Sequence, residues 1–446
     1  MRVVVALVAL ALSTMARGNG AFETYGASLR ARAMAHAAAA IDGAAAAQTN
    51  PAAVGRAPAE LLVHAGFSID APVVDVIVSE QQAADDPLRP ALPAPIAGLT
   101  LGFLLPLNLV LRDRVFVGAT AYFPSQVLAR ARAHDPQRPF FYAYDSGTDH
   151  YDLSVAVGAR IMDWLYLGAG ARLSAGQQGE VILRVDPVRG RMTQQSVDTF
   201  QYPKASPTAG VLIGPLGIDD VVTGSLAVVY REPSAFDISL PASLTIEGAD
   251  VDAVLAVLLR ANFSPRSVTA GAGLELWRDI IVDVEAQYAF WSEAPAPFVL
   301  TGVDLGGEGL EALGLQDGLD APAVGQERVL SPGFVDTVNM RAGVEWRLLK
   351  DLLALRAGYQ YRPSPVPDQT SGTNIIDCNA HVLATGFGLT FDLPSAFARP
   401  VTIEAAYQVQ LLEPRAASKN SPNDEVGPWA AQGVVHALAV GFAYQF

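Results

Sequence analysis

Charged side chains that fall inside regularly alternating segments are the strongest candidates for chemistry in this chain. They lie opposite apolar residues, on the polar face of those segments: Arg160, Asp283, Glu285, Arg341, Glu345, Arg347, Arg356 and Glu404. A charge buried without a partner is costly, so we expect these residues to pair with one another or with the N-terminal segment. A second use of the same groups is to hold a carboxylate ligand by a charge-assisted hydrogen bond. The candidate ligand-binding cations are Arg341, Arg356 and Arg160.

Catalytic chemistry finds little support in the sequence. A hydrolase would need a nucleophile oriented by a histidine, and no serine partner signature accompanies the histidines His64, His150, His381 and His436. Cys378 is the single cysteine, which rules out an intrachain disulfide, a redox pair and a cysteine-based metal site. The sequence therefore predicts no catalytic residues, no metal site and no cofactor, with Cys378 as an inert small residue.

Composition excludes some classes of protein and favours another. The 446 residues carry a formal net charge of −15 and no basic stripe, which argues against nucleic acid because phosphate contacts need clustered Lys and Arg. Apolar residues make up 51% of the chain, and the mean hydropathy is +0.26. After the first twenty residues there is no apolar run of about 18, so transmembrane helices are not expected. Closed strands remain, because only helices and barrels pair every backbone amide in hydrocarbon.

Period-two alternation places apolar side chains on one face of a strand and polar ones on the other. In residues 338–348 one face carries Val338, Met340, Val344 and Trp346, and the other face carries charged residues. About fourteen segments show this pattern: 61–70, 96–106, 114–123, 150–161, 164–176, 205–216, 221–231, 254–277, 280–291, 335–348, 352–362, 379–391, 400–411 and 434–446. We predict an all-β fold, a transmembrane antiparallel up-and-down β-barrel. The segment 254–277 is irregular, since residues 254–259 also suit a short loop helix and Pro265 interrupts it.

Short turns and long connections alternate between these segments. Asp113, Asp163, Asp279 and Asp351 each lie in a tight turn, where Asp tolerates the backbone and bonds it locally. The long connections are 71–95, 124–149, 177–204, 232–252, 292–334, 363–378 and 412–432. Such asymmetry is typical of outer-membrane barrels, which have short turns inside the cell envelope and long loops outside. We therefore expect a multi-pass barrel in the outer membrane of a Gram-negative cell, surrounded by its lipids.

The two ends of the chain support export and assembly. Residues 1–20 read as a secretory signal peptide, with cleavage after Gly20 or, alternatively, after Ala16. The last segment alternates up to Phe446, so the protein ends on an apolar strand with an aromatic residue. This ending resembles the signal that the outer-membrane assembly machinery reads. We place the barrel at 61–446, the signal peptide at 1–20 and a separate Ala-rich piece at 21–60, which forms either a plug in the lumen or a periplasmic linker.

Several motifs in this order resemble one known group. The Ala-rich piece carries Asp42-Gly43 and closes on Asn50-Pro51-Ala52; downstream lie Tyr288-Ala289-Phe290-Trp291-Ser292 and Pro365-Val366-Pro367-Asp368. Together with Phe446 these match the plug ending, the Tyr-x-x-Trp-Ser element and the Pro-rich loop of the FadL/TodX family of outer-membrane channels for hydrophobic compounds. The chain departs from the family at residues 374–379, where an expected acidic-Arg pair has no Arg, which puts a ligand-carboxylate contact from this loop in doubt.

The resemblance implies a mechanism and site residues. It implies a helical plug at 21–60 and passive uptake of long-chain fatty acids or other hydrophobic molecules, caught by outer loops, held in a lumenal pocket and released sideways through the wall. Phe298 and Leu300 would belong to the capturing loop, and Arg341 or Arg356 would hold a fatty-acid carboxylate. Phe298 and Leu300 can instead pack the loop against the barrel rim. We expect a monomer.

Two other classes of protein remain open on the sequence. A diffusion porin would share the polar interior, but removal of the N-terminal piece would scarcely change its conductance, whereas it would open a plugged channel. An outer-membrane phospholipase would show lipase activity as a purified protein.

Overall fold

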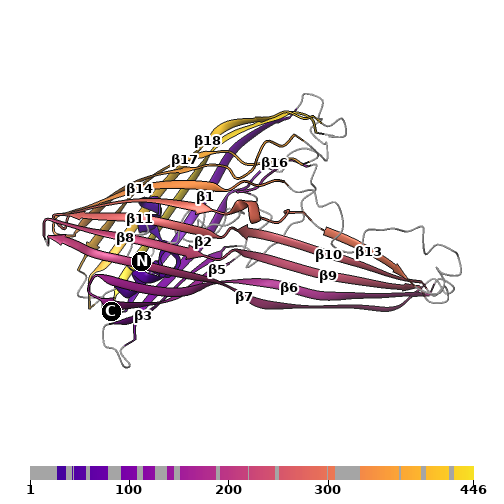
Figure 1. The fold of residues 1–446 in the computed structure, drawn as a ribbon, viewed down its shortest axis with the longest axis horizontal. Helices are drawn as coiled ribbons and strands as arrows, with labels where there is room; N and C mark the ends of the chain where they lie inside the picture. The colour runs from indigo at the N-terminus through magenta and orange to yellow at the C-terminus, as the bar shows by residue number, and fades with distance from the viewer. Residues whose placement is uncertain are drawn as a thin grey trace, which may run out of the picture.

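The protein folds as a closed barrel in which every wall strand is antiparallel to both neighbours. The computed structural model describes residues 28–36, 43, 45–56, 61–78, 92–107, 114–125, 138–144, 151–186, 191–218, 220–246, 251–298, 300–306, 332–370, 373–392, 398–420 and 426–446. The wall strands are β1 (Leu62–Val78), β2 (Ile96–Pro106), β3 (Val115–Pro124), β5 (Asp152–Met162), β6 (Leu165–Asp186), β7 (Arg191–Ile218), β8 (Val222–Arg231), β11 (Ser267–Leu276), β12 (Ile280–Ala289), β14 (Thr337–Leu348), β15 (Leu353–Arg362), β17 (Ala380–Phe391), β18 (Val401–Ala417) and β19 (Trp429–Gln445). The predicted fourteen-stranded barrel is thus confirmed (Figure 1).

The first and last strands close the ring. β1 pairs with β19 from Leu62↔Gln445 to Val78↔Trp429 without a register shift. The amide of Phe446 donates to the Leu61 carbonyl at 2.8 Å, so the last residue of the chain is tied to the start of the first strand. Closure matters because an open sheet edge in hydrocarbon would leave a row of backbone groups without partners.

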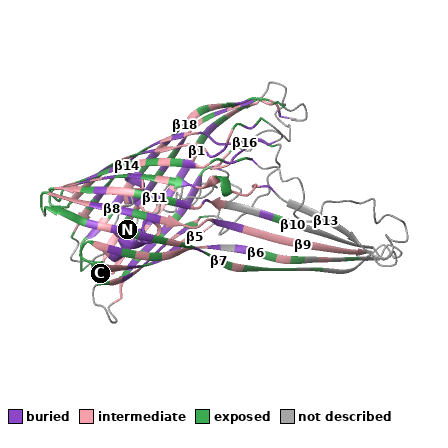
Figure 2. Ribbon diagram, in the orientation of Figure 1, coloured by how far each residue is buried: buried purple, intermediate pink, exposed green. Residues whose placement is uncertain are grey.

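The alternation seen in the sequence is realised on the two faces of the wall. Along the barrel strands buried and exposed residues alternate (Figure 2). On β14 the outward Met340 is 59% exposed, whereas the inward Glu345 is 2% exposed. No helix within the described ranges is both long and apolar enough to span a bilayer.

Short turns gather at the end of the barrel that holds the C-terminus (Figure 1). The turns at Asp163, at Asp279 and at Asp351 are confirmed, and Asp351 has a positive φ of 67°. The turn residue Asp113 lies outside the described residues, as do residues 1–27 with the predicted signal peptide. The domain boundaries at residues 20 and 60 stay predictions.

One predicted strand was wrong in its extent. Residues 254–277 form two strands, since β10 (Val251–Ser264) ends before Pro265 and β11 begins after it. Only β11 joins the wall, where it pairs with β8 and β12. Pro265 has no amide hydrogen to donate, so the ladder breaks there. Residues 254–259 are strand rather than the loop helix that the sequence also allowed.

Each of the seven predicted long connections contains strand residues as well. β6 and β7 continue as a paired ribbon through most of 177–204. Connection 232–252 contains β9 (Ser234–Ile246) and connection 292–334 contains β13 (Leu300–Gly306). β9 pairs in parallel with β6 and antiparallel with β10, which in turn pairs with β13. These strands extend far beyond the barrel on the side away from the C-terminus (Figure 1).

Candidate functional site

The described parts of the N-terminal piece lie inside the barrel (Figure 1). They are the short helices α3 (Leu29–Ala33) and α4 (Ala46–Thr49) and the 3₁₀ turn η1 (Pro51–Arg56). Ser28 begins α3 by accepting a hydrogen bond from the Ala31 amide at 3.1 Å, an N-cap in the usual sense. Small residues make up most of these elements, and nearly all are buried. We refer to residues 28–56, as far as they are described, as the plug segment.

Inward-facing glycines let the plug segment touch the wall backbone. Gly158, Gly168 and Gly210 are register partners on three adjacent strands. A Cβ atom at Gly168 would overlap the Pro51 carbonyl, and one at Gly158 or Gly210 would also meet the plug segment. A second such place is Gly343 with its partner Gly358, where a Cβ would overlap Met34. The plug segment therefore packs at two places against glycines of the wall, where no side chains intervene.

The Asn-Pro-Ala motif makes the first of these contacts. Asn50 is fully buried and ends α4, and its side-chain oxygen accepts a hydrogen bond from the Ala52 amide at 3.0 Å. Pro51 opens η1, where a proline costs no hydrogen bond. Gly43 adopts a φ of 115°, which favours glycine. Asp42 lies outside the described residues.

Wall side chains donate hydrogen bonds to carbonyls of the plug segment. Arg231 of β8 donates to the Gln48 carbonyl at 2.9 Å and also to that of Thr49. Gln408 of β18 donates to the Arg32 carbonyl at 2.7 Å. The last carbonyls of a short helix lack regular helical partners, and these wall donors supply hydrogen bonds to such carbonyls.

Glu345 joins the plug segment to two neighbouring strands. Its carboxylate accepts from Arg30 of α3 at 2.8 Å, from Arg356 at 2.7 Å and from Arg347 at 3.2 Å. Arg356 also reaches Glu404 at 2.6 Å. The pairing expected from the sequence is confirmed for these groups, and one partner does come from the N-terminal segment.

The other predicted ligand-binding arginines also have partners in the wall. Arg341 forms an ion pair with Glu285 at 2.6 Å and donates to Gln287 at 2.8 Å. Arg160 lies with its guanidinium carbon 5.8 Å from the centre of the Tyr166 ring. A ligand role for Arg160, Arg341 or Arg356 stays a prediction, and at the last two a ligand would have to displace a carboxylate.

The outer mouth holds an apolar cluster that includes one predicted capture residue. Phe298 is 4% exposed and packs with four other buried residues; this outer cluster is Phe140, Phe298, Phe334, Val366 and Ile375. Tyr142 and Trp291 pack against it, with ring centres 5.9 Å apart. Leu300 begins β13.

A pair of very short strands lies next to the outer cluster. β4 (Phe140–Phe141) pairs in parallel with β16 (Ile375–Ile376), far apart in the sequence. Phe140 and Ile375 belong to the outer cluster, whereas Phe141 and Ile376 belong to a larger one. This lumenal cluster extends to the plug segment: Ala45, Val74, Ile96, Tyr122, Phe141, Tyr144, Ile376, Cys378, Ala380, Leu412, Ala417, Val426, Trp429, Ala431, Val435 and Ala437. The strand pair therefore separates two apolar regions.

Side-chain hydrogen bonds hold β4, β16 and their flanking residues in the outer mouth. The Trp429 ring nitrogen donates to Asn374 at 3.0 Å, and Tyr144 donates to Gln410 at 2.6 Å. Arg415 donates to the carbonyl of Asp377 at 2.7 Å. Sequence reasoning missed this site. The feature of the sequence that could have indicated this site is a pair of apolar dipeptides in otherwise polar connections, Phe140-Phe141 and Ile375-Ile376.

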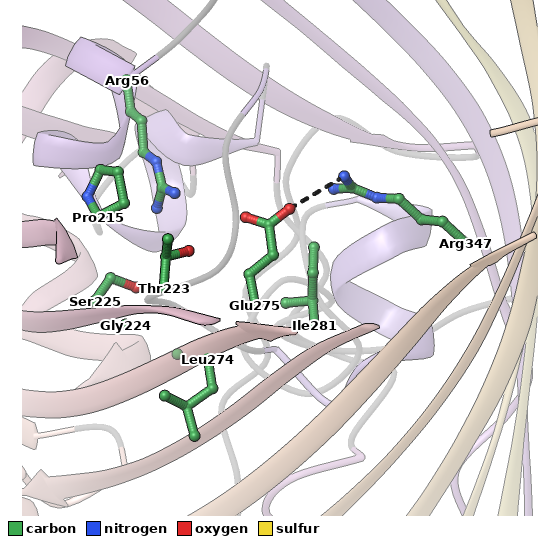
Figure 3. Close-up of a pocket in the computed structure, with 10 residues that line it drawn as sticks. Arg56, Pro215, Thr223, Gly224, Ser225, Leu274, Glu275, Ile281 and Arg347 are labelled. Carbon is green, nitrogen blue, oxygen red and sulfur yellow. Dashed lines mark ion pairs between the residues drawn. The ribbon is translucent and has the colours of Figure 1, made fainter. Parts of the chain in front are cut away.

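A small cavity lies at the opposite mouth, near the short turns (Figure 3). It is lined by Arg56 of the plug segment and by wall residues that include Thr223, Ser225, Glu275 and Arg347. Its volume of about 40 Å³ is far below the roughly 300 Å³ or more of sites for larger ligands. With a polar lining and this size, the cavity suits water rather than a hydrophobic ligand.

Two of the described histidines have side-chain hydrogen-bond partners. His381 bonds Tyr359 at 2.8 Å and Glu413 at 2.9 Å, and His436 bonds Tyr407 at 2.7 Å. His150 lies outside the described residues. Within the described ranges no group of His, Cys, Asp or Glu side chains is arranged to hold a metal ion.

A closed antiparallel barrel with an apolar outer face and a polar, filled interior defines the class of outer-membrane β-barrels. The family described as "Outer membrane protein transport protein (OMPP1/FadL/TodX)" has a model that matches residues 323–446. The predicted resemblance to the FadL/TodX family and the predicted outer-membrane localisation are thereby confirmed. The family is described as one of transport proteins, which agrees with the prediction that the chain is not an enzyme.

Individual relatives agree with this assignment. Alkane uptake protein A of Marinobacter nauticus is 25% identical over 225 residues, which are 49% of this chain and 45% of that protein; the match thus spans under half the length of the relative. A FadL homologue of Pseudomonas aeruginosa aligns with 97% of this chain and 99% of its own, at 13% identity and a TM-score of 0.57. The toluene transporter TodX of P. putida aligns with 94% and 98%, at 13% identity and a TM-score of 0.55. At such identities the solved structures show the fold alone.

Gly168→Ala tests the close contact between wall and plug segment. The new Cβ would overlap the Pro51 carbonyl, and overpacking of this kind costs about 1–3 kcal/mol. We expect the thermal unfolding temperature of the purified protein in detergent to fall by several degrees. Gly224→Ala is the matched control, because its Cβ would meet Leu274, Gly273 and Leu216 at ordinary van der Waals distances. Equal stability of the two variants would contradict the contact.

Cys378 provides a test of burial in the mouth. Burial, with the Asp377 carboxylate beside it, raises the pKa of the Cys378 thiol to about 12, so at pH 8 it is almost wholly the unreactive thiol. We expect no labelling by a maleimide in the folded protein at pH 8 and complete labelling in denaturant. Rapid labelling of the folded protein would show that the mouth is open to water.

Proposed function

We propose that the protein is a passive outer-membrane channel for hydrophobic small molecules, including hydrocarbons and long-chain fatty acids. The observation that carries the proposal is the pair of apolar clusters in the outer half of the barrel, which β4 and β16 separate. Buried apolar groups of this kind suit a solute that must cross a hydrophilic surface layer without meeting water. Two similar proteins are named for alkane uptake and toluene transport, in accord with such solutes.

Capture would take place at the outer cluster. Trp291 and Tyr142 are only partly buried on its edge, so an apolar solute can reach their rings without unfolding the loop. Rigid aromatic side chains give a large contact area at a low cost in conformational entropy. Phe298 is the residue of this site that the sequence suggested, and a role for Leu300 stays a prediction.

Passage from the outer cluster to the lumenal cluster would require β4 and β16 to separate. Their four residues are at most 3% exposed, so no solute fits between the clusters while they stay paired. Only two residues on each side form this pair, which is few for a stable sheet. We propose that the pair is the barrier on the uptake route.

The alternative of a general diffusion porin is less well supported. A porin lumen is water-filled, whereas here the plug segment contacts the wall backbone at Gly168 and Gly343. Ions would have to pass through tight backbone contacts.

Release would occur sideways through the wall, because the plug segment obstructs the direct path to the periplasm. β7 carries a bulge between Ile213 and Leu216, where its pairing with β8 shifts register. Pro215 at this bulge lines the small cavity, together with Arg56 at the end of the plug segment. We propose this bulge as the place where the wall opens. We also propose that the outer-membrane assembly machinery recognises the C-terminal strand that ends at Phe446. The protein would act as a monomer.

A disulfide across the strand pair tests the route. Phe140→Cys and Ile375→Cys, made together with Cys378→Ser, place two thiols on register partners. We expect uptake of radiolabelled dodecane by cells that produce the oxidised variant to fall to the level of cells without the protein. Dithiothreitol should restore it.

The matched control is a crosslink that the route does not cross. Leu355→Cys with Phe387→Cys, also with Cys378→Ser, joins register partners on the lipid face of β15 and β17, and its oxidation should leave uptake unchanged. Full dodecane uptake through the oxidised Phe140–Ile375 crosslink would refute the barrier. A protein that never accelerates dodecane uptake would refute the channel itself.

A further inference from the structure

One arginine of the wall contacts the residues that follow both strands of the β4–β16 pair. Arg362 is the last residue of β15. Its Nη2 atom donates to the Tyr144 hydroxyl at 2.9 Å and lies 3.5 Å from a carboxylate oxygen of Asp377. Tyr144 follows β4 by three residues, and Asp377 follows β16 directly. A single guanidinium therefore joins both halves of the pair to the barrel wall.

The ion pair of Arg362 with Asp377 is shielded from water. The side chain of Asp377 is 1% exposed and that of Arg362 is 17% exposed. Among the described residues Arg362 is the one ion-pair partner of Asp377, and neither oxygen of this carboxylate accepts a hydrogen bond from them. A buried charge that loses its partner is strongly unfavourable. The position of the segment after β16 therefore depends on Arg362.

Tyr144 fixes the end of β4 to two strands of the wall. Its hydroxyl accepts from Arg362 of β15 and donates to Gln410 of β18 at 2.6 Å. Burial raises the pKa of Tyr144 to about 12, so the hydroxyl keeps the proton that the second bond needs. The guanidinium carbon of Arg362 lies 5.4 Å from the centre of the Tyr144 ring, which is within the range of a cation–π contact.

We propose that Arg362 is the positioning residue that keeps β4 and β16 paired and thereby keeps the barrier closed. The proposal rests on the proposed uptake route and adds the side chain that controls its barrier. Without the guanidinium, Asp377 has no counter-charge and moves toward water, while Tyr144 loses a hydrogen-bond donor and a cation–π contact. Both changes separate strands that are joined by only two residues on each side.

Cys378 reports whether the pair is closed, because it lies two residues after β16 and is 1% exposed. We expect Arg362→Gln to raise the rate of maleimide labelling of Cys378 in the folded protein at pH 8 at least tenfold. In an unchanged structure the substitution would slow labelling, because burial and the Asp377 charge raise the pKa of the Cys378 thiol and the Arg362 charge lowers it. A gain therefore reports exposure.

Two control variants accompany this measurement. Arg347→Gln takes a wall arginine from its ion pairs at the opposite mouth and should leave labelling at the wild-type rate. Arg362→Gln combined with Asp377→Asn removes the carboxylate that would lack a counter-charge, so labelling should fall at least threefold below that of Arg362→Gln. Equal labelling of the single and double variants would contradict a role of the ion pair.

Cys378 that stays unlabelled in folded Arg362→Gln would overturn the proposal. Should this variant fail to assemble, Tyr144→Phe decides, since it removes the hydroxyl that Arg362 contacts without a change in charge. Labelling should then rise at least threefold, and an unchanged rate would overturn the proposal.

Uptake of radiolabelled dodecane by cells producing the full-length protein tests the channel separately. Arg362→Gln should raise this uptake at least twofold. An exposed Cys378 with unchanged uptake would overturn the barrier on the route. Exposure of Cys378 without dodecane uptake through either protein would overturn the proposed channel function and leave the role of Arg362 in the strand pair intact.

Discussion

The structure depends on the Glu345 carboxylate and the charges that meet at it. Arg30 from the plug segment, Arg356 from the neighbouring strand and Arg347 from its own strand all donate to this one group. A carboxylate in the interior of a barrel that faces hydrocarbon on its other side cannot remain without partners. The same ion pairs therefore stabilise the wall and hold the N-terminal segment in the lumen.

Close backbone contacts also hold the plug segment against the wall. Glycines on adjacent strands, such as Gly158 and Gly168, remove side chains where the Asn50-Pro51 segment meets the wall. The plug segment also packs apolar side chains such as Val54 against Phe116 and Leu212 of the wall. Wall donors such as Arg231 and Gln408 add hydrogen bonds to its carbonyls.

Much of the barrel was predictable because the membrane imposes a strict rule on its strands. Lipid on one face and a polar lumen on the other produce alternation, and segments such as 338–348 show it in the sequence itself. That rule ends at the membrane surface. Beyond the membrane surface, neither face of β9 or of the outer part of β7 must match lipid. Their sequences therefore need not alternate, and these connections were predicted as loops. The sequence correctly predicted that Pro265 interrupts the strand pattern. It did not indicate that the strand before Pro265, β10, lies outside the barrel wall.

The candidate site was predictable in one half only. Charged residues on polar faces, such as Glu285 and Arg341, are on adjacent strands in register, so their pairing follows from the alternation. The strand pair of Phe140-Phe141 with Ile375-Ile376 joins connections more than two hundred residues apart, and no periodicity relates them. Only the folded barrel brings both into one mouth and places the outer cluster on one side and the lumenal cluster on the other.

The central claim is that hydrophobic solutes, and not ions, cross a filled barrel. Single-channel recording of the full-length protein in planar bilayers in 1 M KCl, with solute transfer into vesicles measured on the same preparation, tests it most directly. The account predicts no steady ion conductance together with accelerated transfer of dodecane. A persistent open conductance of porin size, with no acceleration of dodecane transfer, would contradict it.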